Sequence, residues 1–156
     1  MQKIMPCLWF DNQAEDAAKF YVSIFKNSKI TSVSHYGDTG PGPKGSVMVV
    51  TFQLNGEDFM GLNGGPIFKF TEAISMVARC DSQAEIDTYW EKLSAGGQPG
   101  VCGWLKDKYG LSWQIVPSQI GEWMKAGGAK SDRVMAAVMK MTKLDMAAMQ
   151  RAYDGG

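Results

Sequence analysis

Residues 103–117 read GWLKDKYGLSWQIVP, and this stretch decides the fold of the second half of the chain. Two apolar segments flank residues 107–110, which contain the turn-forming residues Asp107 and Gly110. Gly110 can adopt a positive φ without steric cost, as tight turns often require. The stretch therefore predicts a β-hairpin whose first strand closes at Leu105 and whose second strand begins at Leu111.

The second strand of this hairpin carries a polar side chain among apolar ones. Side chains alternate between the two faces of a strand, so Gln114 shares a face with Ser112 and Val116. The amide of Gln114 therefore projects from the middle of a hydrophobic strand. Gln114 is a candidate site residue, although this pattern names no reaction.

The bulk composition favours a single globular domain that binds a small molecule or another protein. The chain has 156 residues, with 16 basic and 16 acidic side chains and a formal net charge of zero. This balance argues against nucleic acid or an anionic membrane as a partner. No apolar run reaches the roughly 20 residues that span a bilayer, and the N-terminal sequence lacks the pattern of a secretion signal. Cys7, Cys80 and Cys102 are widely spaced, so we expect reduced thiols and a cytoplasmic location.

A short motif occurs twice, as DNQAE at residues 11–15 and as DSQAE at residues 81–85. Asn12 with Glu15, and Ser82 with Glu85, have the spacing of a capping box, which satisfies free backbone N–H groups at the start of a helix. Apolar residues follow both motifs at helical spacing. We interpret the motif as an internal repeat, and chance similarity between two helix starts is the alternative.

The predicted elements follow the same order in both halves of the chain. The first half reads as a strand (3–10), a helix (13–25) and three strands (30–36, 46–54 and 58–62). The second half reads as a strand (75–80), a helix (83–95) and three strands (96–100, 101–105 and 111–116). We therefore predict one compact α+β domain of two βαβββ modules, 1–70 and 71–117, whose curled mixed sheets surround a shared cleft.

The remaining residues, 118–156, are predicted to form a helical tail. A first short helix contains Ile120 to Met124, a second is capped by Ser131 or Asp132, and a third spans residues 144–153. Five of the eleven methionines lie between residues 135 and 149 of this tail. We interpret them as core or interface packing, because Met is a flexible filler of apolar gaps. A peptide-binding groove is the alternative.

Four motifs connect the chain to a known family: LWF at 8–10, NGGP at 63–66, CGW at 102–104 and SWQIVP at 112–117. Together with the duplicated module, they resemble the PhnB-like branch of the vicinal oxygen chelate superfamily of glyoxalases, dioxygenases and bleomycin-resistance proteins. Many members of this branch carry the label 3-demethylubiquinone-9 3-methyltransferase. The resemblance implies paired modules around a cleft and a homodimer whose modules complete each other's clefts.

Metal-dependent members of this superfamily bind a divalent ion through His and Glu side chains on the first and last strands of each module. The resemblance places Ile4 and Ile74 at the first-strand positions, and Met60 and Gln114 at the last-strand positions. Aliphatic side chains are no ligands, and a neutral Gln cannot replace the charge of a carboxylate. We therefore expect no catalytic metal and no other cofactor.

Residues 40–45, GPGPKG, match the spacing G-x-G-x-x-G of dinucleotide-binding turns. In those turns the glycines lead from a strand into a helix that holds the pyrophosphate. Here prolines interrupt the motif and a strand is predicted to follow, so we interpret it as a β–β loop. A common methyl-donor fold also needs a Gly-rich strand-to-helix turn, so no motif supports the methyltransferase label.

We predict a ligand site built from amide and apolar side chains. Its residues are Asn63, Phe68, Trp104, Gln114 and Met60. Asn63 lies in a Gly-rich segment that forms either a linker or the edge of the cleft. An apolar pocket with a few placed polar groups is the usual form of a small-molecule site.

The predicted function is metal-free binding of a small, partly hydrophobic molecule. As an alternative, Gln114, Asn63 and His35 perform lyase, isomerase or transferase chemistry without a metal. His35 could act as a general base because an imidazole titrates near neutral pH, and a surface position is its alternative role. A protein-interaction module is the third hypothesis.

Overall fold

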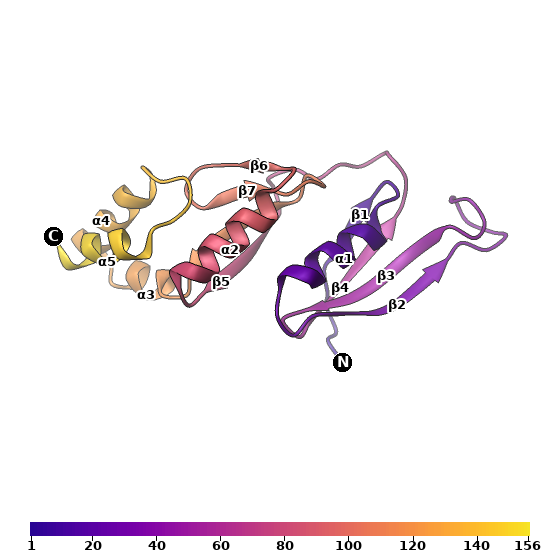
Figure 1. The fold of residues 1–156 in the computed structure, drawn as a ribbon, viewed down its shortest axis with the longest axis horizontal. Helices are drawn as coiled ribbons and strands as arrows, with labels where there is room; N and C mark the ends of the chain where they lie inside the picture. The colour runs from indigo at the N-terminus through magenta and orange to yellow at the C-terminus, as the bar shows by residue number, and fades with distance from the viewer. The chain divides into compact units, whose positions relative to one another are not determined.

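The computed structural model describes residues 1–156 and divides them into two compact units, Met1–Phe70 and Thr71–Gly156. Each unit contains one four-stranded mixed sheet with a helix packed on it (Figure 1). The second unit also contains three further helices at the C-terminal end of the chain. The predicted α+β class and the two βαβββ modules are confirmed.

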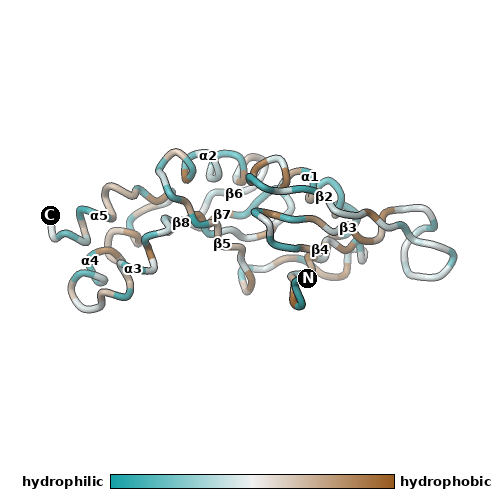
Figure 2. The backbone as a smooth tube through the Cα atoms, turned by 90° about the horizontal axis from the view of Figure 1, so that it is seen from below, coloured by the Kyte–Doolittle hydropathy of each residue, from teal (hydrophilic) through white to brown (hydrophobic).

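The first unit consists of β1 (Cys7–Phe10), α1 (Ala14–Ile24), β2 (Lys29–His35), β3 (Val47–Leu54) and β4 (Glu57–Asn63). The strand order is β1-β4-β3-β2, in which β1 pairs with β4 in parallel and the other pairs are antiparallel. The strand β1 is shorter than the predicted segment 3–10. Figure 2 shows that the loop between β2 and β3 is largely hydrophilic, which agrees with its Gly, Pro and polar sequence.

One face of the first sheet is covered by α1. The buried side chains of α1 recur at intervals of three and four residues, as a helix with one apolar face requires. They are Ala14, Ala17, Ala18, Tyr21 and Ile24. Every second residue of β3 is buried in the same core, namely Val50, Phe52 and Leu54. The opposite face of this sheet carries no helix of its own unit.

The second unit repeats the arrangement with β5 (Ser75–Cys80), α2 (Gln83–Ser94), β6 (Gln98–Pro99), β7 (Trp104–Lys106) and β8 (Ser112–Pro117). The strand order is β5-β8-β7-β6, and β5 again pairs in parallel with the last strand, β8. The two sheets therefore have the same topology, in agreement with the internal repeat.

The predicted hairpin between β7 and β8 is organised by the buried side chain of Asp107. Its Oδ1 accepts hydrogen bonds from the backbone N–H groups of Tyr109 (2.9 Å) and Leu111 (3.1 Å). Its Oδ2 accepts one from the indole N–H of Trp113 (2.9 Å). Gly110 has a φ of +87°, as the turn chemistry predicts. One carboxylate thus fixes the loop and the first residues of β8.

The two helix starts of the repeat are capped differently. Ser82 Oγ accepts a hydrogen bond from Glu85 N (3.2 Å), which confirms the cap predicted for α2. The capping box predicted for Asn12 and Glu15 is wrong, because the N-cap position of α1 is Gln13 and makes no side-chain cap. Instead, Asn63 Oδ1 at the end of β4 accepts a hydrogen bond from Ala14 N (2.8 Å).

The tail forms α3 (Ile120–Lys125), α4 (Gly128–Val138) and α5 (Met146–Asp154). The predicted start of the middle helix at Ser131 or Asp132 is wrong, since α4 begins at Gly128. Ser131 Oγ instead donates to the carbonyl oxygens at the end of α3, at 2.8 and 3.0 Å.

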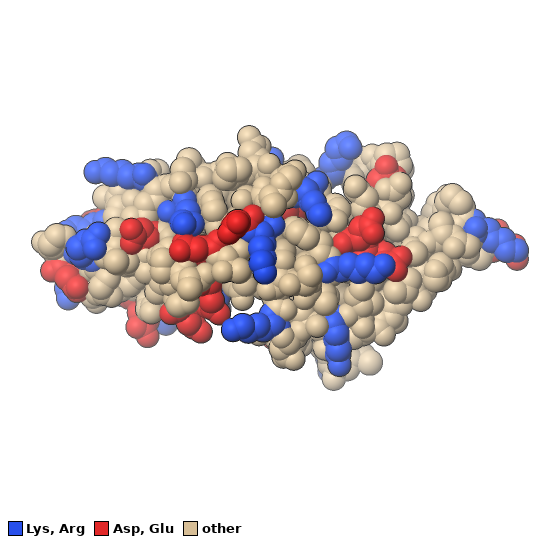
Figure 3. All heavy atoms as spheres, viewed as in Figure 1, with Lys and Arg blue, Asp and Glu red and all other residues tan.

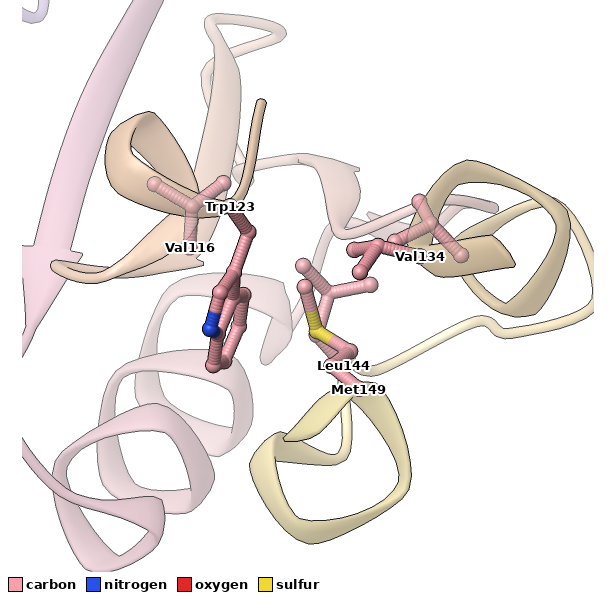
Figure 4. Close-up of a cluster of buried hydrophobic side chains, with 6 residues drawn as sticks. Val116, Trp123, Val134, Leu144 and Met149 are labelled. Carbon is pink, nitrogen blue, oxygen red and sulfur yellow. The ribbon is translucent and has the colours of Figure 1, made fainter. Parts of the chain in front are cut away.

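The tail helices enclose a small hydrophobic core of their own within the second unit. Figure 4 shows side chains from β8, α3, α4 and α5 converging on it. Its buried members are Val116, Trp123, Val134, Val138, Leu144 and Met149. Met149 is fully buried, whereas Met135 and Met139 are 46% and 66% exposed. Packing therefore accounts for Met149 but not for the other two.

None of the five helices combines the length and the apolar character needed to cross a bilayer. On the face shown in Figure 3, Lys and Arg side chains are interspersed with Asp and Glu.

Candidate functional site

The candidate site lies on the face of the second sheet that α2 does not cover. On β5 and β8, Ala78, Cys80 and Ile115 are buried on the helix side, and the intervening residues point to the other face. We call this other side the open face. It comprises Ser75, Val77, Trp104, Lys106, Ser112 and Gln114.

Gln114 occupies the centre of the open face. Its register partners are Val77 on β5 and Trp104 on β7, so its amide lies between an exposed aliphatic side chain and a half-buried indole. Gln114 Nε2 donates to Ser75 Oγ at 2.9 Å, which orients the amide. Its Oε1 accepts no hydrogen bond from the protein. This arrangement offers a ligand an acceptor beside an aromatic wall.

Ser112 carries the one buried side-chain oxygen of the chain that makes no hydrogen bond. The residue is only 1% exposed. Burying an unpaired hydroxyl costs about 1–3 kcal/mol. The register partners of Ser112 are Ser75 and Lys106, so its hydroxyl belongs to the same face as the amide of Gln114.

An ion pair borders this face. Lys106 Nζ contacts the carboxylate of Glu72, whose side chain is 62% exposed. The hydrogen bond from Lys106 holds the pKa of Glu72 below its usual range. Glu72 belongs to the irregular segment before β5, so the partner of the Lys106 ammonium group is a residue outside the sheet.

In the first unit, the corresponding face of the sheet contains Met60 and Trp9. Met60 pairs with Cys7 on β1, and Leu62 of the same strand pairs with Trp9. The ring of Phe68 packs edge-on against Trp9, with centroids 4.9 Å apart, and Trp9 Nε1 donates to the Gly65 carbonyl at 2.9 Å. The structure thus brings Phe68 to Trp9, a residue that the sequence analysis did not select.

The amide of Asn63 is engaged with the backbone of its own unit. Besides capping α1 through Oδ1, it donates from Nδ2 to the Val47 carbonyl at 3.0 Å. Its own carbonyl accepts a hydrogen bond from the buried Tyr36 hydroxyl at 2.5 Å. Both polar atoms of the Asn63 side-chain amide thus have a backbone partner within the first unit.

The first unit also contains a cavity of about 580 Å³. It lies between the start of α1, the loop after Tyr36 and the Gly-rich segment after β4. Its lining comprises Asp11, Asn12, Glu15, Asp16, Tyr36, Pro41, Gly42, Pro43, Ser46, Val47, Asn63, Gly64, Gly65 and Pro66. Three carboxylates and no basic side chain line it, so it is unsuited to an anionic ligand.

Residues 40–45, which match G-x-G-x-x-G, lie in the loop between β2 and β3. No helix follows them, so they cannot form a dinucleotide-binding turn. Gly42 instead lies against the Tyr36 ring, where a Cβ atom would meet ring carbon at 2.2 Å. The motif serves to close the loop over an aromatic side chain.

The other reactive side chains do not belong to the open face. His35 is an exposed residue at the end of β2, opposite Val47 in register. Cys80 is fully buried, and burial raises the pKa of its thiol to about 12. Cys102 is half-buried, and its Sγ lies 3.8 Å from Met139 Sδ. No nucleophile is hydrogen-bonded to His35.

The donor set of the chain does not fit the metal site that the resemblance implies. Ile4 precedes β1 and is 88% exposed, and Ile74 precedes β5 and is 53% exposed. Met60 and Gln114 do lie on the last strands of their sheets, but neither supplies an anionic oxygen. No three His, Cys, Asp or Glu side chains are placed to hold one ion.

Comparison with known proteins agrees with this duplicated fold. The model of the family named 3-demethylubiquinone-9 3-methyltransferase matches residues 2–116. The chain belongs to this family. A PhnB protein from Bacillus cereus is 40% identical, with a TM-score of 0.69, over 75% of this chain and 100% of its own. No functionally curated protein matches the chain in sequence.

More distant structures share the fold of this PhnB-like chain. Protein PA1353 from Pseudomonas aeruginosa is 18% identical, with a TM-score of 0.63, over 75% of this chain and 98% of its own. The fosfomycin resistance protein FosX from Listeria monocytogenes, solved with Mn(II) and sulfate, is 14% identical, with a TM-score of 0.54. That match covers 81% of this chain and 98% of FosX. The chain is thus related in structure to the glyoxalase-like proteins.

Proposed function

We propose that this PhnB-like protein binds a small, partly hydrophobic molecule on the open face, without a metal. The observation that carries the proposal is the group formed by Gln114, Ser75 and Trp104. Gln114 is oriented by Ser75, retains an unpaired amide oxygen, and lies opposite an indole in the sheet. Such a face provides one directional polar contact within an apolar surface, as small-molecule sites commonly do.

The family name suggests methyl transfer, but nothing in this chain's site supports that reaction in particular. The FosX structure contains Mn(II). The resemblance places Ile4, Met60, Ile74 and Gln114 of this chain at the positions that metal-dependent members of the superfamily use for ligands. In this protein, we propose, a hydrogen bond to the amide oxygen of Gln114 takes the place of metal coordination, while the fold is that of these relatives.

Native mass spectrometry of freshly purified protein, with elemental analysis of the same sample, tests the proposal. We expect a co-purified organic mass and no stoichiometric divalent ion. The Gln114→Leu variant, which keeps a similar volume, should lose that mass, whereas His35→Gln should retain it. A stoichiometric divalent ion, or a bound mass that persists in Gln114→Leu, would contradict the proposal.

A metal-independent enzyme is the second candidate, because Gln114 could also polarise a substrate carbonyl or hold a hydroxyl. In that case Gln114→Ala would lower turnover of a bound substrate as well as affinity. If Gln114→Ala changes neither affinity nor turnover, only a protein-interaction role remains.

We further propose that the chain forms a homodimer. Support comes from large apolar side chains that remain exposed in and beside the segment between the two sheets. They are Ile67 (76% exposed), Phe68 (62%) and Ile74 (53%). A second copy of the chain would remove such residues from water, which is the main driving force of subunit association.

A further inference from the structure

The structure assigns a chemical class to the ligand of the open face: a small carboxylate, whose anionic group binds Lys106 with the hydroxyls of Ser112 and Ser75 in place of Glu72. This inference rests on the proposed function, since it concerns the same face. It adds that one end of the ligand is negatively charged.

The hydroxyl of Ser112 lacks a hydrogen-bond partner, which a ligand oxygen would supply. It is buried, makes no hydrogen bond, and lies between Ser75 and Lys106 in the register of the sheet. Neighbouring strands lie about 4.7–4.9 Å apart, so the side chains of Ser75, Ser112 and Lys106 are neighbours on this face. A ligand oxygen that accepts from Ser112 would satisfy the hydroxyl that the free protein leaves unpaired.

Lys106 already forms an ion pair with a carboxylate of the chain itself. The ammonium group contacts Glu72, a mostly exposed residue of an irregular segment. Exposed ion pairs contribute little to stability, so a ligand carboxylate of better fit can replace the Glu72 side chain. Glu72 is then an internal competitor for the site.

The arrangement of polar and apolar residues on the open face indicates the size and polarity of the ligand. Ser75 connects Gln114 with Ser112. Its Oγ accepts a hydrogen bond from Gln114 Nε2, and Ser112 is its register partner on β8. The apolar part of the ligand would lie at Trp104 and Val77, and its charged group at Lys106. A short aromatic or aliphatic carboxylate has this arrangement of parts.

Benzoate and benzamide form a matched pair of probes, since they share shape and differ in charge. Their dissociation constants are measured by calorimetry at low salt for the full chain and for variants at Lys106, Ser112, Glu72 and Gln114. We expect wild-type protein to bind benzoate about fivefold more tightly than benzamide. Lys106→Met should reduce this ratio to about one, and Ser112→Ala should reduce it partly.

Glu72→Gln should increase the preference for benzoate, whereas Lys106→Met and Ser112→Ala should decrease it. Removing the competitor should tighten benzoate binding about threefold and leave benzamide unchanged. The exposed pair of Asp38 and Lys44, which is 2.7 Å long, provides matched controls. Asp38→Asn and Lys44→Met should leave both dissociation constants unchanged.

The outcomes separate this inference from the proposed function. If both probes bind, depend on Gln114, and show equal affinities in wild type, Lys106→Met and Glu72→Gln, the carboxylate inference is wrong and the proposed function stands. If neither probe binds, the proposed function fails, and the inference fails with it. A benzoate preference that the Asp38 or Lys44 variants also remove would show an unspecific charge effect and overturn the inference.

Discussion

The buried hydroxyl of Ser112 is costly for folding, and in the carboxylate binding that we propose a ligand would satisfy it. The hydroxyl is buried without a partner in the free protein. We expect Ser112→Ala to raise the free energy of unfolding by about 1 kcal/mol, because it removes an unpaired buried hydroxyl at little change in volume. Urea unfolding of the ligand-free protein measures this change. A loss of stability would mean that the hydroxyl is satisfied in solution.

Cys80 provides a prediction on pH dependence. Burial, followed by the charges of Glu85 and Asp81, raises the pKa of its thiol from an ordinary value of 9.0 to about 12. Between these values the unfolded chain releases a proton that the folded chain retains, so the free energy of unfolding falls as pH rises.

Urea unfolding at about pH 8 and about pH 10 measures the contribution of Cys80. Wild-type protein should lose more stability between these conditions than Cys80→Ala does. An equal loss in both proteins would show that Cys80 ionises normally in the folded state. Iodoacetamide labelling of the folded protein should also leave Cys80 unmodified, because the side chain is fully buried.

Local interactions explain which residue roles could be read from the sequence. The turn at Asp107 and Gly110 was predicted because its partners lie within six positions. The role of Asn63 was missed because its partner Ala14 lies 49 positions away. No sequence signal distinguishes a cap supplied by another strand from one supplied by Asn12. Ser112 was placed on the face of Gln114, but its lack of a partner depends on packing that only the structure shows.

At the scale of elements, the start of α1 offers a direct comparison of two asparagines. Asn63→Ala should lower the free energy of unfolding by about 2 kcal/mol, since it removes the bond to Ala14 and the bond to Val47. Asn12→Ala should change it by less than about 0.5 kcal/mol. Chemical denaturation of both variants measures the difference. Equal effects would contradict the assignment of the cap to Asn63.

The order and type of the elements followed from periodicity, and their ends did not. β5 has the predicted bounds, but β1 begins at Cys7 and not at residue 3. At its N-terminal side, the Gln2 side chain binds the backbone of Asp58, at 2.9 Å for the Asp58 N–H. A side-chain contact thus replaces strand pairing there, which an apolar pattern cannot reveal. Likewise, α4 begins three residues before Ser131 because Ser131 bonds to α3.

At the scale of the whole molecule, the duplicated module and its family were accessible from the sequence. Four short motifs and one repeat identified them, because each module needs the same caps, turns and apolar faces. The tail lies outside the matched family region of residues 2–116. Its core joins α3, α4 and α5 to Val116 of β8, so the tail helices pack onto the second sheet through this strand.

The proposed homodimer makes a prediction at this scale. Light scattering after size exclusion should give twice the chain mass of 17.1 kDa at micromolar concentration. Phe68→Ser with Ile74→Ser should shift the protein toward the monomer, because both side chains are exposed in the single chain. As a matched control, Met135→Ser with Met139→Ser should leave the dimer intact, although both of these side chains are exposed on the tail. A wild-type monomer would refute the proposal.

An NMR titration shows directly whether a small molecule binds at the open face. Benzamide is added to ¹⁵N-labelled protein while backbone, side-chain amide and indole signals are followed. We expect shifts at the side-chain amide of Gln114, the indole of Trp104 and the backbone of Ser75. Shifts confined to Tyr36 and Asn63 would place binding in the cavity of the first unit instead and would contradict binding at the open face.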